Sequence, residues 1–177
     1  MNGVDAYRGL IPAGATFLNF ISYASGAVSL SALSGHRILY IMTHDSIGLG
    51  EDDPTHQPIE TMALIRATPE LVDLRPADGN ETSGAYLFAI SAKGRPSVLA
   101  LARQDLPQLE GSSVEKTMKG GYVLQEVQGA QVTLVGTGSE TSLCVDAAQL
   151  LLKEHGVKVG LVFLYCPSLL FGEHAYF

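Results

Sequence analysis

One stretch decides how this chain folds: Ile38-Leu39-Tyr40-Ile41-Met42-Thr43-His44-Asp45-Ser46-Ile47-Gly48-Leu49-Gly50-Glu51-Asp52-Asp53-Pro54-Thr55-His56-Gln57-Pro58. Its apolar start, residues 38–42, predicts a buried strand, and the polar remainder follows directly. Open α/β sheets place ligand sites at the carboxyl ends of their strands. The two histidines and four carboxylates of the stretch are therefore expected at such an end.

Residues 44–58, called the signature loop below, are expected to be ordered because glycine permits tight turns and proline fixes φ. The residues concerned are Gly48, Gly50, Pro54 and Pro58. His44 and His56 can exchange protons near neutral pH, and Asp52 or Glu51 could orient an imidazole or accept a bond from a substrate hydroxyl. The loop therefore predicts a proton-handling site.

The flanking sequence predicts alternating helices and strands. The expected elements are helices over residues 15–34, 59–67 and 79–93 and strands over residues 71–74 and 97–102. Gly35 is expected to end the first helix, and Asp78 to cap the third, with Glu81 completing a capping-box-like pair. This alternation is typical of a parallel α/β sheet.

A second unit is expected after a linker. Residues 105–121 are rich in Pro, Gly, Ser and charged side chains, which indicates a linker between a first domain over 1–104 and a second over 122–177. The second domain should hold a strand over 131–135, a helix over 140–155 and a strand over 157–165, which is one βαβ motif. Such a motif alone leaves its sheet half exposed.

The signature loop and four further segments resemble the transketolases. These segments are residues 75–81, 103–109, 119–124 and 136–140. The loop differs at one position from the family's usual motif, His-Asp-Ser-Ile-Gly-x-Gly-Glu-Asp-Gly-Pro-Thr-His-Gln-Pro: Asp53 stands where glycine is usual. Aspartate tolerates left-handed backbone, but the resemblance implies that its negative charge lies beside a phosphosugar site. The resemblance covers nearly the whole chain. It implies an N-terminally truncated pyrimidine-binding domain followed by a partial C-terminal domain.

Phe17, Phe20 and Tyr23 recur every third residue, which on a helix gives one aromatic face. By spacing alone this face is part of the core. The resemblance instead implies that the three rings hold the pyrimidine of thiamine diphosphate, since aromatic faces suit offset stacking.

The resemblance also assigns the polar residues. It implies that His44 and Arg103 bind substrate phosphate, that Asp52 recognises a substrate hydroxyl, and that His56 forms hydrogen bonds or transfers protons around the reacting carbons. From the residues alone, His44 could be structural, His56 could cap a helix, and Arg103 could pair with Asp105 or Glu110. A metal-dependent hydrolase is a further alternative, but the spacing of the two histidines matches no compact ligand motif.

The reaction implied is transfer of a two-carbon ketol unit between phosphosugars, as in the pentose phosphate pathway. The family's catalytic glutamate and its diphosphate- and Mg-binding domain lie upstream of the matching segment, so we expect this chain to be inactive alone. Ala77-Asp78-Gly79-Asn80 indicates a helix cap and not a Mg motif, and Glu173-His174-Ala175 is in the wrong position for the catalytic glutamate. No metal ligands are predicted.

Composition limits the partners and the location. A net charge of −7 over 177 residues and a pI near 5.1 argue against nucleic acid and anionic membranes, which require clustered Lys and Arg. Without an apolar run of roughly 20 residues or a secretion signal, a cytoplasmic location is expected. Cys144 and Cys166 are interpreted as buried apolar residues.

The sequence is also compatible with other functions. Dihydroxyacetone synthase shares the signature and the chemistry. A non-catalytic protein that binds full-length transketolase, or a truncated gene product, is a different class. Association is expected in each case, either as a homo-oligomer or with a full-length or N-terminal transketolase subunit, because apolar surface on the 15–34 segment and on the final strand lacks packing partners.

Overall fold

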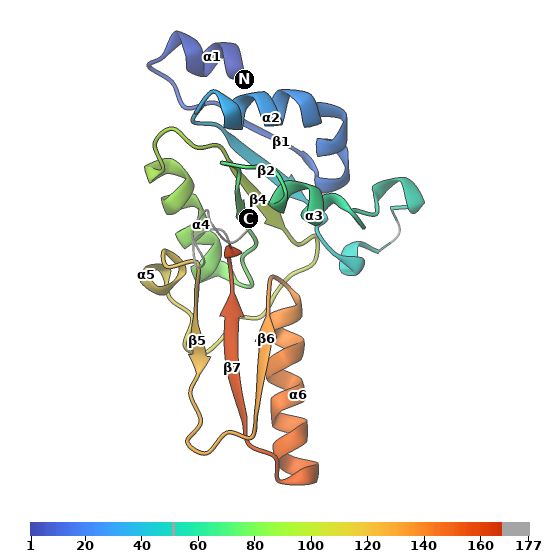
Figure 1. The fold of residues 1–177 in the computed structure, drawn as a ribbon. Coiled ribbons are helices and arrows are strands. Elements are labelled where there is room, and N and C mark those ends of the chain that lie inside the picture. The colour runs from blue at the N-terminus through green and yellow to red at the C-terminus, as the bar shows by residue number, and fades with distance from the viewer. Residues whose placement is uncertain (51, 168–177) are drawn as a thin grey trace.

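The computed structural model describes residues 1–50 and 52–167, and its first unit is built on a parallel sheet (Figure 1). The strands are β1 (Ala13–Phe17), β2 (Leu39–Thr43), β3 (Val72–Leu74) and β4 (Ser97–Leu101), in the order β1-β2-β4-β3. Every pairing between them is parallel. The predicted strands over 38–42, 71–74 and 97–102 are confirmed, and the first lies inside the sheet.

Helices cover both faces of this sheet, because alternate strand residues point to opposite sides. One face packs against α2 (Ser25–Leu33) and α3 (Thr61–Arg66), and the other against α4 (Gly79–Ser91). Tyr40 and Met42 of β2 belong to the α2 side, whereas Leu39 belongs to the α4 side. The hydrophobic runs of the strands therefore follow from burial on two faces.

The helix predicted over residues 15–34 is wrong in its first half. Residues 13–17 form β1, residues 18–24 form the 3-10 helix η1 (Leu18–Ala24), and only Ser25–Leu33 is α-helical. β1 forms because it pairs with the open edge of β2, a long-range contact that local composition does not reveal. The predicted end of the helix is confirmed, since Gly35 has φ 66° and its N–H donates to the Ala32 carbonyl.

The predicted cap of α4 is also confirmed. The Asp78 carboxylate accepts a bond from the Glu81 N–H at 2.9 Å, and Glu81 accepts one from the Ala77 N–H at 2.8 Å. The helix that follows ends at Ser91, close to the expected position.

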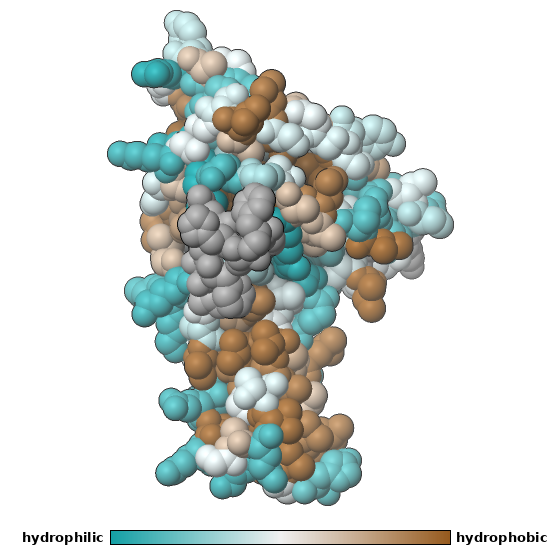
Figure 2. Space-filling view, viewed as in Figure 1, coloured by the Kyte–Doolittle hydropathy of each residue, from teal (hydrophilic) through white to brown (hydrophobic). Residues whose placement is uncertain are grey.

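The second unit is a smaller mixed sheet of β5 (Gly121–Gln125), β6 (Val132–Gly136) and β7 (Val159–Leu164), in the order β5-β7-β6. β6 and β7 are parallel and are joined by α6 (Glu140–His155), which confirms the βαβ motif; β5 pairs antiparallel with β7. Apolar surface gathers over this unit in Figure 2, and Val123, Val132 and Val135 are exposed. β6 is an edge strand within the described residues.

The two units share one hydrophobic core. Leu161 and Phe163 of β7 belong to the same cluster as Leu74 of β3 and Ala85 of α4. The connecting residues 105–121 contain α5 (Val114–Thr117), which packs closely on α4. The remaining elements are α1 (Asn2–Tyr7), η2 (Ile47–Leu49) and η3 (Pro54–His56). Cys166 is buried and Cys144 is half-buried.

Candidate functional site

Three neighbouring strands end in register at one edge of the parallel sheet. Phe17 of β1 lies beside Thr43 of β2, and Thr43 lies beside Leu101 of β4. The residues that follow each strand therefore meet at this carboxyl edge, which is where the sequence placed the site. Phe20, His44 and Arg103 come directly after these strand ends.

The structure brings the aromatic and imidazole rings together. The Phe17 ring centroid lies 4.0 Å from that of His44 and 5.2 Å from that of His56, and Phe20 lies 5.0 Å from His56. Phe20 is also 5.9 Å from Phe17 and 6.0 Å from Tyr23. The five rings thus form one cluster, called the ring cluster below.

The local helix type explains this arrangement. A 3-10 helix has three residues per turn, so side chains three apart lie on one face. Phe20 and Tyr23 belong to η1, and Phe17 directly precedes it. Tyr23 is 88% exposed, so the interpretation of these aromatics as core does not hold for it.

Polar contacts orient both imidazoles. The Nδ1 atoms of His44 and His56 lie 2.9 Å from the hydroxyls of Thr43 and Thr55, respectively. The Asn19 amide donates to the Thr55 carbonyl and ties η1 to the signature loop. Sequence reasoning missed Asn19, although its position between two selected aromatics was a signal.

Asp52 lies between His44 and Arg103 without a close bond to either. Its Oδ2 is 3.7 Å from His44 Nε2 and 3.9 Å from Arg103 Nε. These distances exceed hydrogen-bond length, and Arg103 is about half exposed. Of the carboxylates considered as ion-pair partners for Arg103, the structure places Asp52 within 4 Å, in place of the alternatives Asp105 and Glu110. Glu51, the other candidate to orient an imidazole, and Glu173-His174-Ala175 lie outside the described residues.

The signature loop has unusual backbone conformations. His44 has φ 65° although it is not glycine. Asp53, where the family usually has glycine, has φ 60° and ψ 168°. This is not the left-handed helical region that aspartate tolerates but a region populated almost only by glycine, so the residue is strained.

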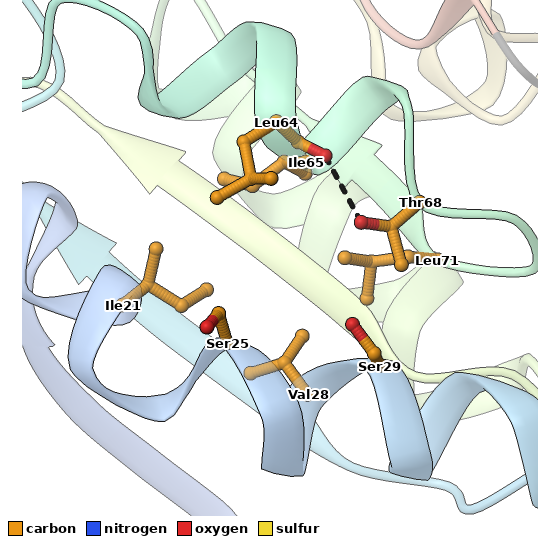
Figure 3. Close-up of a pocket in the computed structure, with 8 residues that line it drawn as sticks. All are labelled: Ile21, Ser25, Val28, Ser29, Leu64, Ile65, Thr68 and Leu71. Carbon is orange, nitrogen blue, oxygen red and sulfur yellow. Dashed lines mark hydrogen bonds between the residues drawn. The ribbon is translucent and has the colours of Figure 1, made fainter.

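An open hollow of about 240 Å³ lies beside the ring cluster, lined by Ala15, Thr16, Phe17, Phe20 and Thr43. Its aromatic wall suits a planar ring. A second cavity, between α2 and α3, has only about 20 Å³, room for one water molecule, and is a packing gap (Figure 3).

Across residues 1–50 and 52–167, His, Cys, Asp and Glu side chains form no group of three or more that could hold a metal ion. In the same ranges no helix has the length and apolar character to cross a membrane.

Sequence reasoning also missed a buried ion pair behind His44. Arg75 Nε donates to Asp45 Oδ2 at 2.7 Å, and Arg75 Nη1 lies 2.6 Å from Glu140 Oε2. Burial lowers the pKa of Arg75, but the two carboxylates raise it by more, so the guanidinium stays charged. Burial raises the pKa of Asp45, and Arg75 opposes this. Arg75 directly follows a buried strand, the same signal that singled out Arg103.

A second buried group lies under α4 and is called the α4 cluster: Asp78, Glu81 and Tyr122. Glu81 is fully buried and accepts a hydrogen bond from the Tyr122 hydroxyl. Burial raises the pKa of the Glu81 carboxyl to about 7, against the effect of the bonds from Tyr122 and Ala77. Asp78 further accepts bonds from the Leu109 N–H at 3.0 Å and the Gln108 amide at 2.6 Å.

Comparison with known proteins gives a consistent result. The family description "Transketolase, pyrimidine binding domain" matches residues 1–108, and "Transketolase-like TK C-terminal domain" matches residues 120–175. A probable transketolase of Schizosaccharomyces pombe is 57% identical over 166 residues, which are 94% of this chain and 24% of the relative. A crystal structure of Pichia stipitis transketolase in complex with sedoheptulose-7-phosphate has a TM-score of 0.88 at 56% identity, covering 93% of this chain and 24% of that chain.

A split-gene transketolase, described as an inactive beta4 tetramer, is a more distant match. Its TM-score is 0.76 at 25% identity, and the match covers 93% of this chain and 52% of that chain. The present chain spans about a quarter of the length of the S. pombe and P. stipitis proteins.

Proposed function

Because this chain belongs to the transketolase family, we propose that it forms the pyrimidine-binding and substrate-binding side of an active site that transfers a two-carbon ketol unit between phosphosugars. The observation that carries this proposal is the convergence of the ring cluster, Asp52 and Arg103 at one sheet edge. These residues are far apart in the sequence, so their meeting is not a consequence of local structure. The P. stipitis relative, crystallised with a sugar phosphate, supports the substrate class.

The residues fit one end of thiamine diphosphate. The hollow beside Phe17 and Phe20 can accept a planar aminopyrimidine. We propose that this chain holds the pyrimidine end only, against the aromatic wall of this hollow. When bound, thiamine diphosphate supplies the carbon nucleophile and the electron sink for ketol transfer.

The protein side chains position substrate and move protons. Arg103 and His44 are proposed to bind the substrate phosphate, because a guanidinium and an imidazole N–H both donate hydrogen bonds to an anion. Asp52, whose contacts to these two side chains are long, is free to accept a bond from a substrate hydroxyl. His56 is held through Nδ1 by Thr55, so its other nitrogen is proposed to donate or accept a proton at the reacting carbons.

Residues 1–177 are proposed to need a complementary polypeptide for turnover. Exposed apolar side chains support association: Tyr23, Leu30, Leu33, Ile47 and Ile59. The partner is proposed to be a second copy, a full-length transketolase or an N-terminal transketolase subunit. The split-gene relative, inactive as a tetramer of one subunit type, supports the last of these. We also propose that domains over 1–104 and 122–177 are joined by residues 105–121.

A second candidate function is a non-catalytic protein that binds full-length transketolase. The same exposed apolar side chains favour it, since they provide a contact surface whether or not turnover follows.

Reconstitution tests both candidates. Ketol transfer is measured with thiamine diphosphate and Mg²⁺ for the chain alone and for the chain mixed with an N-terminal transketolase half or the full-length enzyme. We expect activity with the N-terminal half, and with the full-length enzyme no gain over the activity of that enzyme alone. In that mixture Arg103→Gln should raise the phosphosugar KM on the order of tenfold, the effect of one lost charge-assisted hydrogen bond.

Arg95→Gln is the matched control, because Arg95 lies before β4 and Arg103 lies after it. Arg95 pairs with Glu70 at 3.3 Å, far from the ring cluster along the strand, so its KM should not change. Activity of the chain alone would refute the expected dependence on a partner. Binding to full-length enzyme without any gain of activity would favour the non-catalytic function.

A further inference from the structure

His44 is held in an unfavourable backbone conformation between two fixed neighbours. Thr43 before it is paired in the sheet on both sides, and the Asp45 N–H after it donates to the Leu101 carbonyl at 3.2 Å. A positive φ is unfavourable at a non-glycine residue, so it persists only where the surroundings enforce it. The position of the His44 ring over Phe17 therefore depends on what holds Asp45.

The side chain of Asp45 is held from the second unit through Arg75. Asp45 is 5% exposed and Arg75 is 8% exposed, and their bond is 2.7 Å long. Arg75 also donates to the Thr137 carbonyl at 3.2 Å and faces Glu140 at 2.6 Å. One guanidinium thus connects the residue beside His44 to the start of α6.

The turn between β6 and α6 is shaped to accept this guanidinium. Gly138 has φ 55°, and a Cβ atom there would lie 2.8 Å from Arg75 Nε, so any other residue would displace the side chain. Ser139 in the same turn donates to the Ser46 hydroxyl of the signature loop at 3.3 Å. Gly138 therefore leaves room for the Arg75 side chain, and Glu140 acts as its ion-pair partner.

We propose that Arg75 and the turn of residues 137–140, together called the Arg75 bridge, are positioning elements for His44, through which the second unit sets the geometry of the signature loop. That the Arg75 bridge positions His44 for phosphosugar chemistry rests on the proposed function. That the bridge positions His44 at all does not depend on the proposed function, because the contacts of the bridge lie wholly within this chain. Arg75 and Glu140 do not touch the ring cluster, so they act through Asp45.

The test compares Arg75→Lys, Glu140→Gln and Arg66→Lys in the 177-residue chain. Lysine keeps the charge but cannot bond to Asp45, Thr137 and Glu140 together. Arg66 is the matched control, because its Nε also pairs at 2.9 Å with a buried carboxylate, Asp73, outside the bridge. Glu140→Gln is the mild variant, since Glu140 is 42% exposed and its loss should not prevent folding.

Two readouts separate positioning from stability: hydrogen exchange of the amides of residues 44–50, and the ring NMR signals of His44 without cofactor or substrate. We expect Arg75→Lys and Glu140→Gln to speed exchange on the order of tenfold, the effect of one lost charge-assisted bond, and to shift the His44 signals. Arg66→Lys should lower the unfolding midpoint without either change.

Unchanged His44 signals and loop exchange in both bridge variants would overturn the proposal, as would equal changes in Arg66→Lys. Because neither readout requires turnover, this result is independent of the reconstitution experiment. Ketol transfer could fail while the exchange and NMR results support the Arg75 bridge, or succeed while those results contradict it.

Discussion

Asp52 at the sheet edge and Glu81 in the α4 cluster are both carboxylates with polar neighbours, yet they are bonded in opposite ways. Asp52 is 30% exposed, and the His44 and Arg103 nitrogens beside it are 3.7 and 3.9 Å away. Glu81 is fully buried and accepts bonds from the Ala77 N–H and the Tyr122 hydroxyl. The α4 cluster uses its bonding capacity within the chain, whereas the site leaves that capacity for a ligand.

This difference predicts where stability resides. Buried polar groups that lose a partner cost about 1–3 kcal/mol each, whereas exposed ion pairs contribute at most about 1 kcal/mol. Substitutions in the α4 cluster should therefore lower the free energy of unfolding, and substitutions at the sheet edge should change ligand binding with little loss of stability.

The largest effect is expected from Asp78→Ala. This change removes the cap of α4, leaves the Leu109 N–H without its acceptor, and takes one of two acceptors from the Gln108 amide, which also bonds to Ser112. We expect the free energy of unfolding, measured with urea, to fall by about 3–5 kcal/mol. Ser113→Ala is the control, because Ser113 caps α5 through one bond and should cost only about 1 kcal/mol. Equal losses would break the distinction between the α4 cluster and an ordinary cap.

The next effect is a pH dependence from Glu81. Its pKa is about 7 in the folded chain, against the usual 4.5 when unfolded. Between these values the unfolded chain binds fewer protons, so the free energy of unfolding should fall as pH rises, by at most about 3 kcal/mol, and the loss should be complete above pH 7.

Urea unfolding at pH 5 and pH 7.5 measures this dependence. Glu81→Gln should flatten it, while the exposed control Glu115→Gln should leave it unchanged. If the slope survived in Glu81→Gln, another buried carboxylate such as Asp45 or Asp73 would be its source.

The smallest effect is expected at the sheet edge, from Asp53→Gly. Glycine adopts φ 60° and ψ 168° without strain, so we expect the free energy of unfolding to rise by about 1 kcal/mol. Arg8→Gly is a matched control far from the ring cluster, since Arg8 has φ 69° and ψ 165° and should gain a similar amount. A loss of stability in Asp53→Gly alone would mean that the Asp53 side chain makes a contact that outweighs the strain.

Local signals predicted much of the fold. The run over residues 38–42 and the cap at Asp78 each depend on neighbours within a few positions, and both were confirmed. β1 was missed because residues 13–17 form a strand only by pairing with β2. The Ala- and Leu-rich composition of residues 15–34 as a whole favoured a helix, which long-range pairing overrode at its start.

The candidate site divides in the same way. The position of the signature loop at a carboxyl edge followed from the strand before it. The assignment of Phe17, Phe20 and Tyr23 to a cofactor site came only from the family resemblance, since periodicity alone favoured core. The bond from Arg75 to Asp45 joins positions 30 residues apart, and Glu140 lies in the other unit, so no local pattern could reveal them.

The unpaired outer side of β6 has a practical consequence. Within residues 1–50 and 52–167, this strand presents backbone donors and acceptors to water beside the exposed Val132 and Val135. Such an edge can template strand addition by a neighbouring molecule. Aggregation of this polypeptide would then depend on two opposing effects: strand pairing along the apolar edge of β6, and repulsion between molecules that each carry a net charge of −7.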